Sequence, residues 1–233
     1  MNFQEGEILI FDKPLRWTSF DVVNNIRAFL KYNAHIPKLK VGHAGTLDPL
    51  ATGVLIICTG KYTKRIEEFQ AFEKEYTGTF TLGATTPCYD LEKEIDQHYD
   101  ISHITPTLIY ETVKKFIGDI LQIPPTFSAI KIDGKRAYKY ARNDEEVKIQ
   151  SKQIYIKEFE ITKISLPEVH FRIVCSKGTY IRAIARDLGK ELNSGAYLSK
   201  LCRTRIGEFT IDKAISIDSF KEALLLEFSS IKQ

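Results

Sequence analysis

The stretch GHAGTLDPLATGVLIICTG, residues 42–60, joins a glycine-rich loop to a continuous apolar run. Such a run bounded by glycines is typical of a strand that is buried on both faces in the middle of a sheet. The loop belongs to a longer segment, residues 32–52, for which no regular structure is expected. Loops of that length are uncommon unless they are functional. We therefore expect a functional loop that leads directly into a central strand.

Strand and helix patterns mix irregularly along the rest of the chain. Two-residue alternation in EYTGTFTLG, residues 75–83, predicts a strand with Tyr76 on its apolar face. Ser19 is expected to cap a helix whose apolar residues, Val22 to Leu30, share one face. Further strands are expected over residues 5–14, 154–164, 170–176 and 198–211, and further helices over residues 64–72, 105–117, 179–192 and 216–228. Because strands and helices do not alternate strictly, the sequence predicts an α+β fold.

Length and composition agree with a single globular domain over residues 1–233. The chain is 43% hydrophobic and 27% charged, which is sufficient for a sizeable core. Its cysteines are far apart, and we expect Cys58 and Cys175, which end apolar runs, to be free core thiols in a reducing compartment. The first residues carry acids where a signal peptide has lysines, and no apolar run is long enough to span a membrane. These features predict a cytoplasmic protein without a membrane anchor.

Several common kinds of site are excluded by spacing. A P-loop has four residues between its glycines and a serine or threonine after its lysine, whereas Gly53 and Gly60 enclose six residues and Lys61 is followed by Tyr62. Cys88 follows a proline, but no second cysteine follows at the spacing of a zinc deaminase. The dinucleotide, GxSxG and HExxH patterns are also missing. We therefore expect neither a metal nor a cofactor.

Asp48 is the most suggestive single residue, and it has two interpretations. Its carboxylate can bond main-chain amides in an Asp-Pro turn, which is a purely structural role. Alternatively it does chemistry, which its neighbours favour: His43 can stack or donate a hydrogen bond, and the flanking glycines let other groups approach the main chain closely.

Three other features carry similar alternatives. Arg182 stands near the start of the helix that follows Gly178, where it is either a surface arginine or a partner that fixes the Asp48 carboxylate. Tyr76 is either a core tyrosine or an aromatic face for a flipped base. The segment KIDGKRAYKYAR, residues 131–142, is either a solvated helix face or an RNA-binding surface.

Together these stretches resemble the bacterial tRNA pseudouridine synthases of the TruB family, which modify uridine 55 in the T-loop. The resemblance rests on DKPLRWTS, GHAGTLDPLATGVLIICTGKYTK, KEYTGTFTLG, PPTFSAIKIDGKRAYKYAR, CSKGTYIRAIARDLG and LSKLCRTRIGEF, and it covers roughly residues 8–210 in order. It implies a pseudouridine synthase fold with a central mixed, largely antiparallel sheet, flanked by helices and loops. It also implies an RNA-gripping insertion at about residues 124–150, with Lys131 and Arg142 in contact with RNA.

The resemblance implies roles for individual residues. Asp48 is the nucleophile, and it attacks the flipped nucleoside at either the ribose or the base. Tyr76 stacks on the uracil and is a candidate for relaying a proton, and Arg182 pairs with Asp48. The remaining residues implied by the resemblance shape or support the pocket: His43, Leu201, Tyr180, Lys13 and Pro14. The implied substrate is the T-arm of tRNA. The reaction is expected to need no metal, no cofactor and no obligatory protein partner, and we expect the protein to be a monomer.

The chain departs from the family pattern in two places. Arg16 stands where the family usually has glycine, so a positive φ there implies strain or a different turn. The chain also leaves room for only one helix after RIGEF, so we expect no C-terminal PUA domain. Two other functions stay open: a tRNA-folding or T-arm-binding protein without chemistry, and a guide-RNA-dependent relative that acts on ribosomal RNA.

Overall fold

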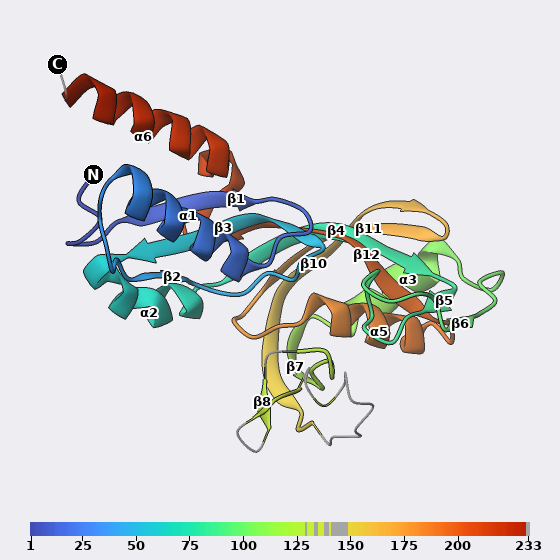
Figure 1. The fold of residues 1–233 in the computed structure, drawn as a ribbon. Helices are drawn as coiled ribbons and strands as arrows, with labels where there is room; N and C mark the ends of the chain where they lie inside the picture. The colour runs from blue at the N-terminus through green and yellow to red at the C-terminus, as the bar shows by residue number, and fades with distance from the viewer. Residues whose placement is uncertain (129, 133–134, 138–139, 141–148, 232–233) are drawn as a thin grey trace. The chain divides into compact units, whose positions relative to one another are not determined.

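The computed structural model describes residues 1–128, 130–132, 135–137, 140 and 149–231, and Arg142 lies outside them. The chain forms two compact units (Figure 1). Unit 1 comprises Met1–Tyr76 and Cys202–Gln233, and unit 2 comprises Thr77–Leu201. Two strands, β4 (Lys74–Leu82) and β12 (Ala196–Ile206), run from one unit into the other.

In unit 1 the strand order is β1-β3-β12-β4, with β2 on β3 and β13 on β12. The pairs β1–β3, β2–β3 and β12–β13 are antiparallel. The other strands of this unit are β1 (Ile8–Lys13), β2 (Val41–His43), β3 (Ala51–Thr59) and β13 (Phe209–Thr210). Its α-helices are α1 (Ser19–Asn33), α2 (Ile66–Ala71) and α6 (Ile217–Ile231), and its 3₁₀ helices are η1 (Gly60–Arg65) and η2 (Ile211–Lys213).

Strand β3 is buried on both faces, as its apolar run predicts. Leu55 and Ile57 belong to a core that includes residues of α1 and α6, and Figure 1 shows these two helices beside the blue β1 strand. Val54 and Ile56 belong to a second core that includes Phe69 of α2. Because successive side chains of a strand point to opposite faces, only a continuous apolar run fills both cores.

The expected helix after Ser19 is confirmed, but the expectation that Ser19 caps it is wrong. Thr18 is the N-cap, and it forms a capping box with Asp21, which lies three residues further on. The Ser19 hydroxyl instead accepts a hydrogen bond from the Leu47 amide at 2.8 Å and lies 3.2 Å from the Leu47 carbonyl oxygen. Ser19 therefore supports the loop that contains Asp48 rather than its own helix.

Unit 2 has the strand order β12-β4-β11-β10-β7. Strand β10 pairs antiparallel with both β11 and β7. The described strands that lie wholly in this unit are β5 (Ala84–Thr85), β6 (Gln97–His98), β7 (Gly118–Gln122), β8 (Lys131–Ile132), β9 (Lys135–Arg136), β10 (Lys152–Ser165) and β11 (Glu168–Cys175). Helices α3 (Pro106–Lys114) and α5 (Ile181–Glu191) also belong to it. The α+β class and the largely antiparallel sheet are thus confirmed.

Aromatic side chains fill the core of unit 2. Phe80 of β4 stacks on Phe171 of β11 with ring centroids 4.0 Å apart, and Phe159 of β10 meets both rings edge-on. Offset and edge-to-face contacts of this kind add to the free energy gained by burial. The alternation predicted for β4 is confirmed, because Tyr76 and Phe80 are both buried.

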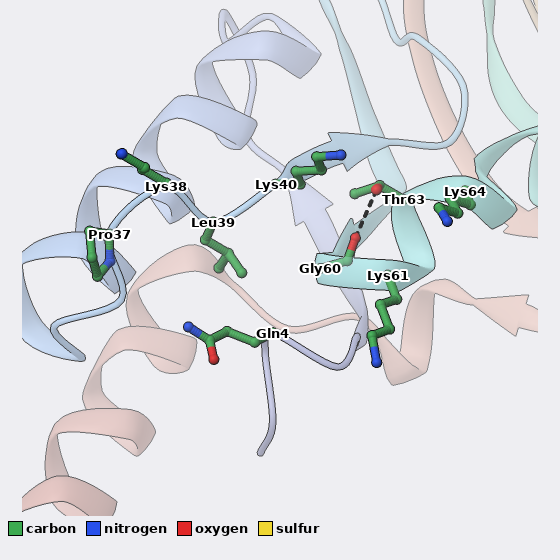
Figure 2. A pocket seen from close by; sticks show the side chains of 9 residues that line it. All are labelled: Gln4, Pro37, Lys38, Leu39, Lys40, Gly60, Lys61, Thr63 and Lys64. Carbon is green, nitrogen blue, oxygen red and sulfur yellow. Dashed lines mark hydrogen bonds between the residues drawn. The ribbon is translucent and has the colours of Figure 1, made fainter.

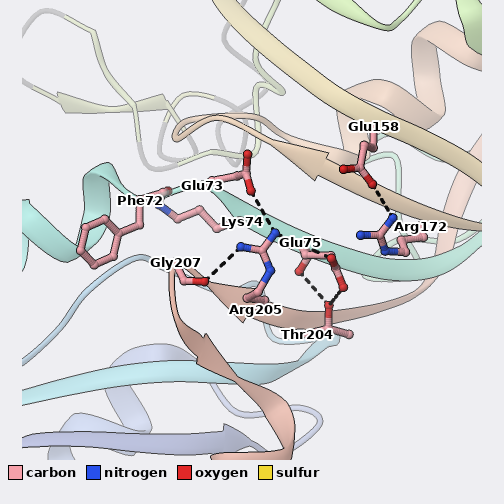
Figure 3. A network of polar contacts seen from close by, with 9 residues as sticks. All are labelled: Phe72, Glu73, Lys74, Glu75, Glu158, Arg172, Thr204, Arg205 and Gly207. Atoms are coloured by element: carbon pink, nitrogen blue, oxygen red, sulfur yellow. Dashed lines mark hydrogen bonds and ion pairs between the residues drawn. The ribbon is translucent and has the colours of Figure 1, made fainter.

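A polar network joins β4 to β12 within unit 1 (Figure 3). The Arg205 guanidinium donates to Glu73 Oε1 at 2.9 Å and to the Gly207 carbonyl at 3.0 Å. The Thr204 hydroxyl donates to Glu75 Oε1 at 2.9 Å. A separate ion pair in Figure 3, between Arg172 and Glu158, joins β11 to β10 within unit 2.

The expectation of an unstructured segment over residues 32–52 is wrong in part. It contains β2, whose Val41 and His43 pair with Thr59 and Ile57 of β3. A strand this short is held by its neighbour rather than by its own sequence pattern. The expected burial of Cys58 and Cys175 in the core is confirmed, and burial raises the pKa of Cys58 to about 11. Among the described residues, no helix is both long and apolar enough to cross a membrane.

Candidate active site

Asp48 lies half-buried in unit 1, in the loop between β2 and β3. The Ala51 amide donates to the Asp48 carbonyl at 3.0 Å, which closes the turn before β3. The Arg16 amide donates to the Pro49 carbonyl at 2.7 Å, so the turn after β1 also supports this loop. Main-chain contacts on both sides of the carboxylate therefore set its position.

Lys13, the last residue of β1, lies beneath the same loop. Its side chain is fully buried, and its ammonium donates to the carbonyl oxygens of Pro14 at 2.9 Å, Trp17 at 2.6 Å and Pro49 at 3.4 Å. Burial lowers the pKa of Lys13 to about 8, while attraction to Asp48 opposes that effect. The structure thus brings Lys13 and Asp48 together, and the expectation that Lys13 supports the site floor has a geometric basis in these contacts.

Arg203 of β12 is a second buried cation at this loop. Its guanidinium donates to the carbonyl oxygens of Val54 at 2.8 Å, Gly45 at 3.1 Å and Thr46 at 3.4 Å. Its charge lies inside the protein, although Arg203 belongs to the cation-rich stretch LSKLCRTR. Its role was missed because its three acceptors come from sequence positions about 150 residues earlier, as the separations of 149 to 158 residues show.

Gly53 allows β3 and β12 to approach closely beside this loop. Its φ of +103° lies in the region that favours glycine, and a Cβ atom there would come within 2.3 Å of the Arg203 carbonyl oxygen. The Gly53 amide donates to Asp12 Oδ1 at 3.0 Å. The glycine-rich sequence therefore serves a close main-chain contact, as expected from the sequence.

His43 ends β2 and enters the loop. Burial lowers the pKa of its imidazole, and the positive charge of Arg203 lowers it further, while a hydrogen bond with Gly45 main chain acts in the opposite direction. A neutral ring at the loop entrance is compatible with stacking, one of the two uses that the sequence suggested for His43.

Arg16 takes a main-chain conformation that favours glycine. Its φ is +68°, in the left-handed region, and its side chain is exposed. The turn therefore carries strain of about 1 kcal/mol for a residue with a Cβ atom.

In unit 2, Arg182 lies in the first turn of α5, near the helix start as the sequence suggested. It is buried and forms an ion pair with the buried Asp90, with Nε 3.4 Å from Oδ2. Its guanidinium also donates to the carbonyls of Cys88 at 3.1 Å and Phe127 at 3.0 Å. Asp90 was missed because nothing near it in the sequence marks a buried carboxylate, and its partner is distant in the chain.

Three other residues predicted to belong to the site lie in unit 2: Tyr180, Leu201 and Lys131. Tyr180 is the N-cap residue of α5, and its main chain forms two hydrogen bonds with the buried Gln122 side chain, at 2.8 and 3.1 Å. Leu201 is half-buried on β12. Lys131 lies in β8, which pairs with β9. The proposed pairing of Arg182 with Asp48 stays a prediction, because the two residues belong to different units.

A basic hollow of about 340 Å³ lies on unit 1 (Figure 2). Four exposed lysines contribute to its walls: Lys38, Lys40, Lys61 and Lys64. Lys61 pairs with Glu5 at 2.6 Å, whereas the other three have no ion pair among the residues that the structure describes. This surface is suited to a polyanion.

Comparison with known proteins gives one consistent result. Residues 31–181 match the family described as "TruB family pseudouridylate synthase (N terminal domain)". A protein of Phocaeicola vulgatus called "tRNA pseudouridine synthase B" is 60% identical over 224 residues, which cover 96% of this chain and 95% of that protein. A protein of Parabacteroides distasonis with the same name is 57% identical over the full length of both chains.

A solved structure agrees with these relatives. The chain resembles a component of "Crystal Structure of a Cbf5-Nop10-Gar1 Complex" with a TM-score of 0.71 and 28% identity, over 94% of this chain. It spans about half of that component, 54% of its length.

Proposed function

Because the chain belongs to the TruB family of pseudouridylate synthases, we propose that it converts uridine 55 in the T-loop of tRNA into pseudouridine. Family membership makes the chain a pseudouridine synthase, an isomerase with the corresponding fold. The tRNA substrate is supported by the names of relatives that it matches over nearly their whole length.

The observation that carries the proposal is the way in which the Asp48 loop is held. Lys13, Ser19 and Arg203 all bond its main chain, so the Asp48 carboxylate has a fixed position on a rigid base. A simple Asp-Pro surface turn needs no such support from buried cations. A nucleophile needs a firmly held main chain, because small errors in its position slow the reaction strongly.

Asp48 is the proposed nucleophile. Its carboxylate bonds to the nucleoside at the ribose or the base, the C1′–N1 glycosidic bond breaks, and the detached uracil turns so that C5 bonds to C1′. The bond between Asp48 and the nucleoside then breaks, which releases the free carboxylate. The hydrogen on C5 is released as a proton and N1 gains one, so the reaction is an isomerisation that consumes no co-reactant. Tyr76 stacks on the flipped base and Arg182 pairs with Asp48, while His43, Tyr180 and Leu201 shape the pocket.

The basic hollow on unit 1 is a second observation in favour of an RNA partner, because its lysines can bind backbone phosphates. The segment of about residues 124–150, which includes Lys131 and Arg142, is the proposed grip on the T-arm. Both units together form the proposed single catalytic domain. The protein acts as a cytoplasmic monomer without an obligatory protein partner.

Tritium release from an unmodified tRNA transcript that carries [5-³H]uridine tests this function. We expect release that is stoichiometric with tRNA and that is lost when the T-loop target is changed to cytidine. Asp48→Ala should keep tRNA affinity and lose turnover.

Other outcomes would contradict the proposal. An equal loss of binding and turnover in Asp48→Ala would reduce Asp48 to a structural turn. Tight tRNA binding without release by the unchanged protein would identify a binding protein instead. Release only with a guide RNA and partner proteins would indicate the guide-dependent class.

A further inference from the structure

Arg203 is buried to 1% exposure, and it has no ion pair among the described residues. Its hydrogen bonds go to main-chain carbonyls alone, from Gly45 and Thr46 of the Asp48 loop and Val54 of β3. Removing a guanidinium from water is costly, and carbonyl dipoles offset that cost only when several of them converge. The loop is therefore shaped around this side chain.

Stability alone does not explain a charge at this position. Buried ionic groups can often be replaced by apolar side chains of similar volume at no loss of stability, or with a gain. What an apolar side chain cannot do is bond two separate segments of main chain at once. Arg203 joins the part of the loop before Asp48 to the strand after it, whereas Lys13 bonds Pro49 on the far side of the carboxylate.

We propose that Arg203 is a positioning residue for the reaction: its guanidinium bridges the Gly45–Thr46 main chain to Val54, so that Asp48 meets the substrate in one orientation. The planar fork of arginine fits this bridge, whereas a lysine ammonium reaches fewer acceptors. This inference rests on the proposed function, since the orientation matters only if Asp48 is the nucleophile.

The kinetic test compares Arg203→Lys with Arg205→Lys. The second variant changes an arginine on the same strand that pairs with Glu73 and does not contact the loop. We expect Arg203→Lys to lower kcat about 10- to 100-fold, as a displacement of the nucleophile does, with the Kd for tRNA within about twofold. Arg205→Lys should keep kcat within about twofold.

Two measurements on the free protein do not depend on activity. Hydrogen exchange at the Leu47 and Ala51 amides should become faster in Arg203→Lys. These amides donate to the Ser19 hydroxyl and the Asp48 carbonyl, and both hydrogen bonds open more often when the loop is held less firmly. In Arg203→Met, the pKa of the His43 imidazole, followed by NMR, should rise because a nearby positive charge is removed.

The outcomes separate the two proposals. Faster exchange together with a fall in kcat supports Arg203 as a positioning residue. Unchanged kcat in a folded Arg203→Lys protein, or unchanged exchange at both amides, overturns that role. If the unchanged protein releases no tritium, the proposed function fails, and faster exchange then shows only that Arg203 orders the loop.

Discussion

The Asp48 loop of unit 1 and the start of α5 in unit 2 are both held by buried cations, but the groups that receive those cations differ. Lys13 and Arg203 bond main-chain carbonyls around Asp48. Arg182 has a carboxylate partner, Asp90, besides its two carbonyls. The first arrangement fixes the path of the main chain, and the second includes a buried acidic side chain.

This difference predicts how each region fails. A carbonyl is present whatever side chain its residue carries, so the Asp48 loop tolerates many changes but depends on the cations and on close main-chain contacts. The start of α5 is sensitive to the Asp90 carboxylate, because its loss removes one partner of a buried ion pair.

The largest effect is expected for Asp90→Ala. Removing one partner of a buried ion pair should lower the free energy of unfolding by about 3–5 kcal/mol, as measured by denaturant titration. Asp187→Ala is the matched control, because Asp187 pairs with Arg186 in a more exposed position and should cost below about 1 kcal/mol. Equal losses of unfolding free energy in the two variants would show that the buried Arg182–Asp90 pair stabilises the protein no more than the Arg186–Asp187 pair does.

Gly53→Ala should destabilise the region of the Asp48 loop through a steric clash rather than through the loss of a charge. The new Cβ atom would collide with the Arg203 main chain, and the positive φ of residue 53 disfavours any side chain. We therefore expect the free energy of unfolding to fall by about 2–4 kcal/mol. Gly118→Ala controls for the backbone alone, because its φ is +96° and its Cβ would meet nothing within 4 Å. A cost no larger than that of Gly118→Ala would refute the close contact between β3 and β12.

Lys13 gives the loop a pH dependence that Lys13→Met should lack. The folded pKa of about 8 is below the ordinary 10.5, so between these values the unfolded chain binds more protons and unfolding becomes harder as pH rises. We expect the stability of the wild type relative to Lys13→Met to increase by about 2–3 kcal/mol from pH 7 to pH 10.5. Denaturation midpoints of both proteins across this range measure it, and parallel curves would contradict the lowered pKa.

The smallest effect is expected for Arg16→Gly, at the turn that bonds Pro49. Relief of the left-handed strain should raise the unfolding free energy by about 0.5–1 kcal/mol, measured as a shift in Tm. Arg16→Ala removes the same charge but keeps the Cβ atom, and it should give no such gain. An equal gain in both variants would assign the effect to charge.

Local patterns in the sequence predict the elements well. The apolar run of β3 and the alternation around Tyr76 depend on neighbouring residues, and both predictions are confirmed. The short strand β2 depends on pairing with β3, and no local pattern reveals it. For Ser19, the spacing of Thr18 and Asp21 marked a better cap, so the error was in the choice between adjacent residues.

The supports of the site are harder to predict, because their partners are distant in the chain. Asp48, His43 and Lys13 stand in motifs that the family resemblance identifies. Arg203 bonds Gly45, which is 158 residues away in the chain, and the Arg182 guanidinium that pairs with Asp90 also bonds Cys88, which is 94 residues away. A buried charge is recognised only when its partners are known.

The distance in sequence between Arg203 and the Asp48 loop has a consequence for synthesis of the protein. The loop leaves the ribosome early, and the arginine that bridges it to β3 is added 158 residues after Gly45. At about 5–20 residues per second, this is a delay of roughly 8–30 s. The nascent chain therefore carries Asp48 without this support until β12 is made, and the Asp48 loop is among the last parts of the protein to gain its final contacts.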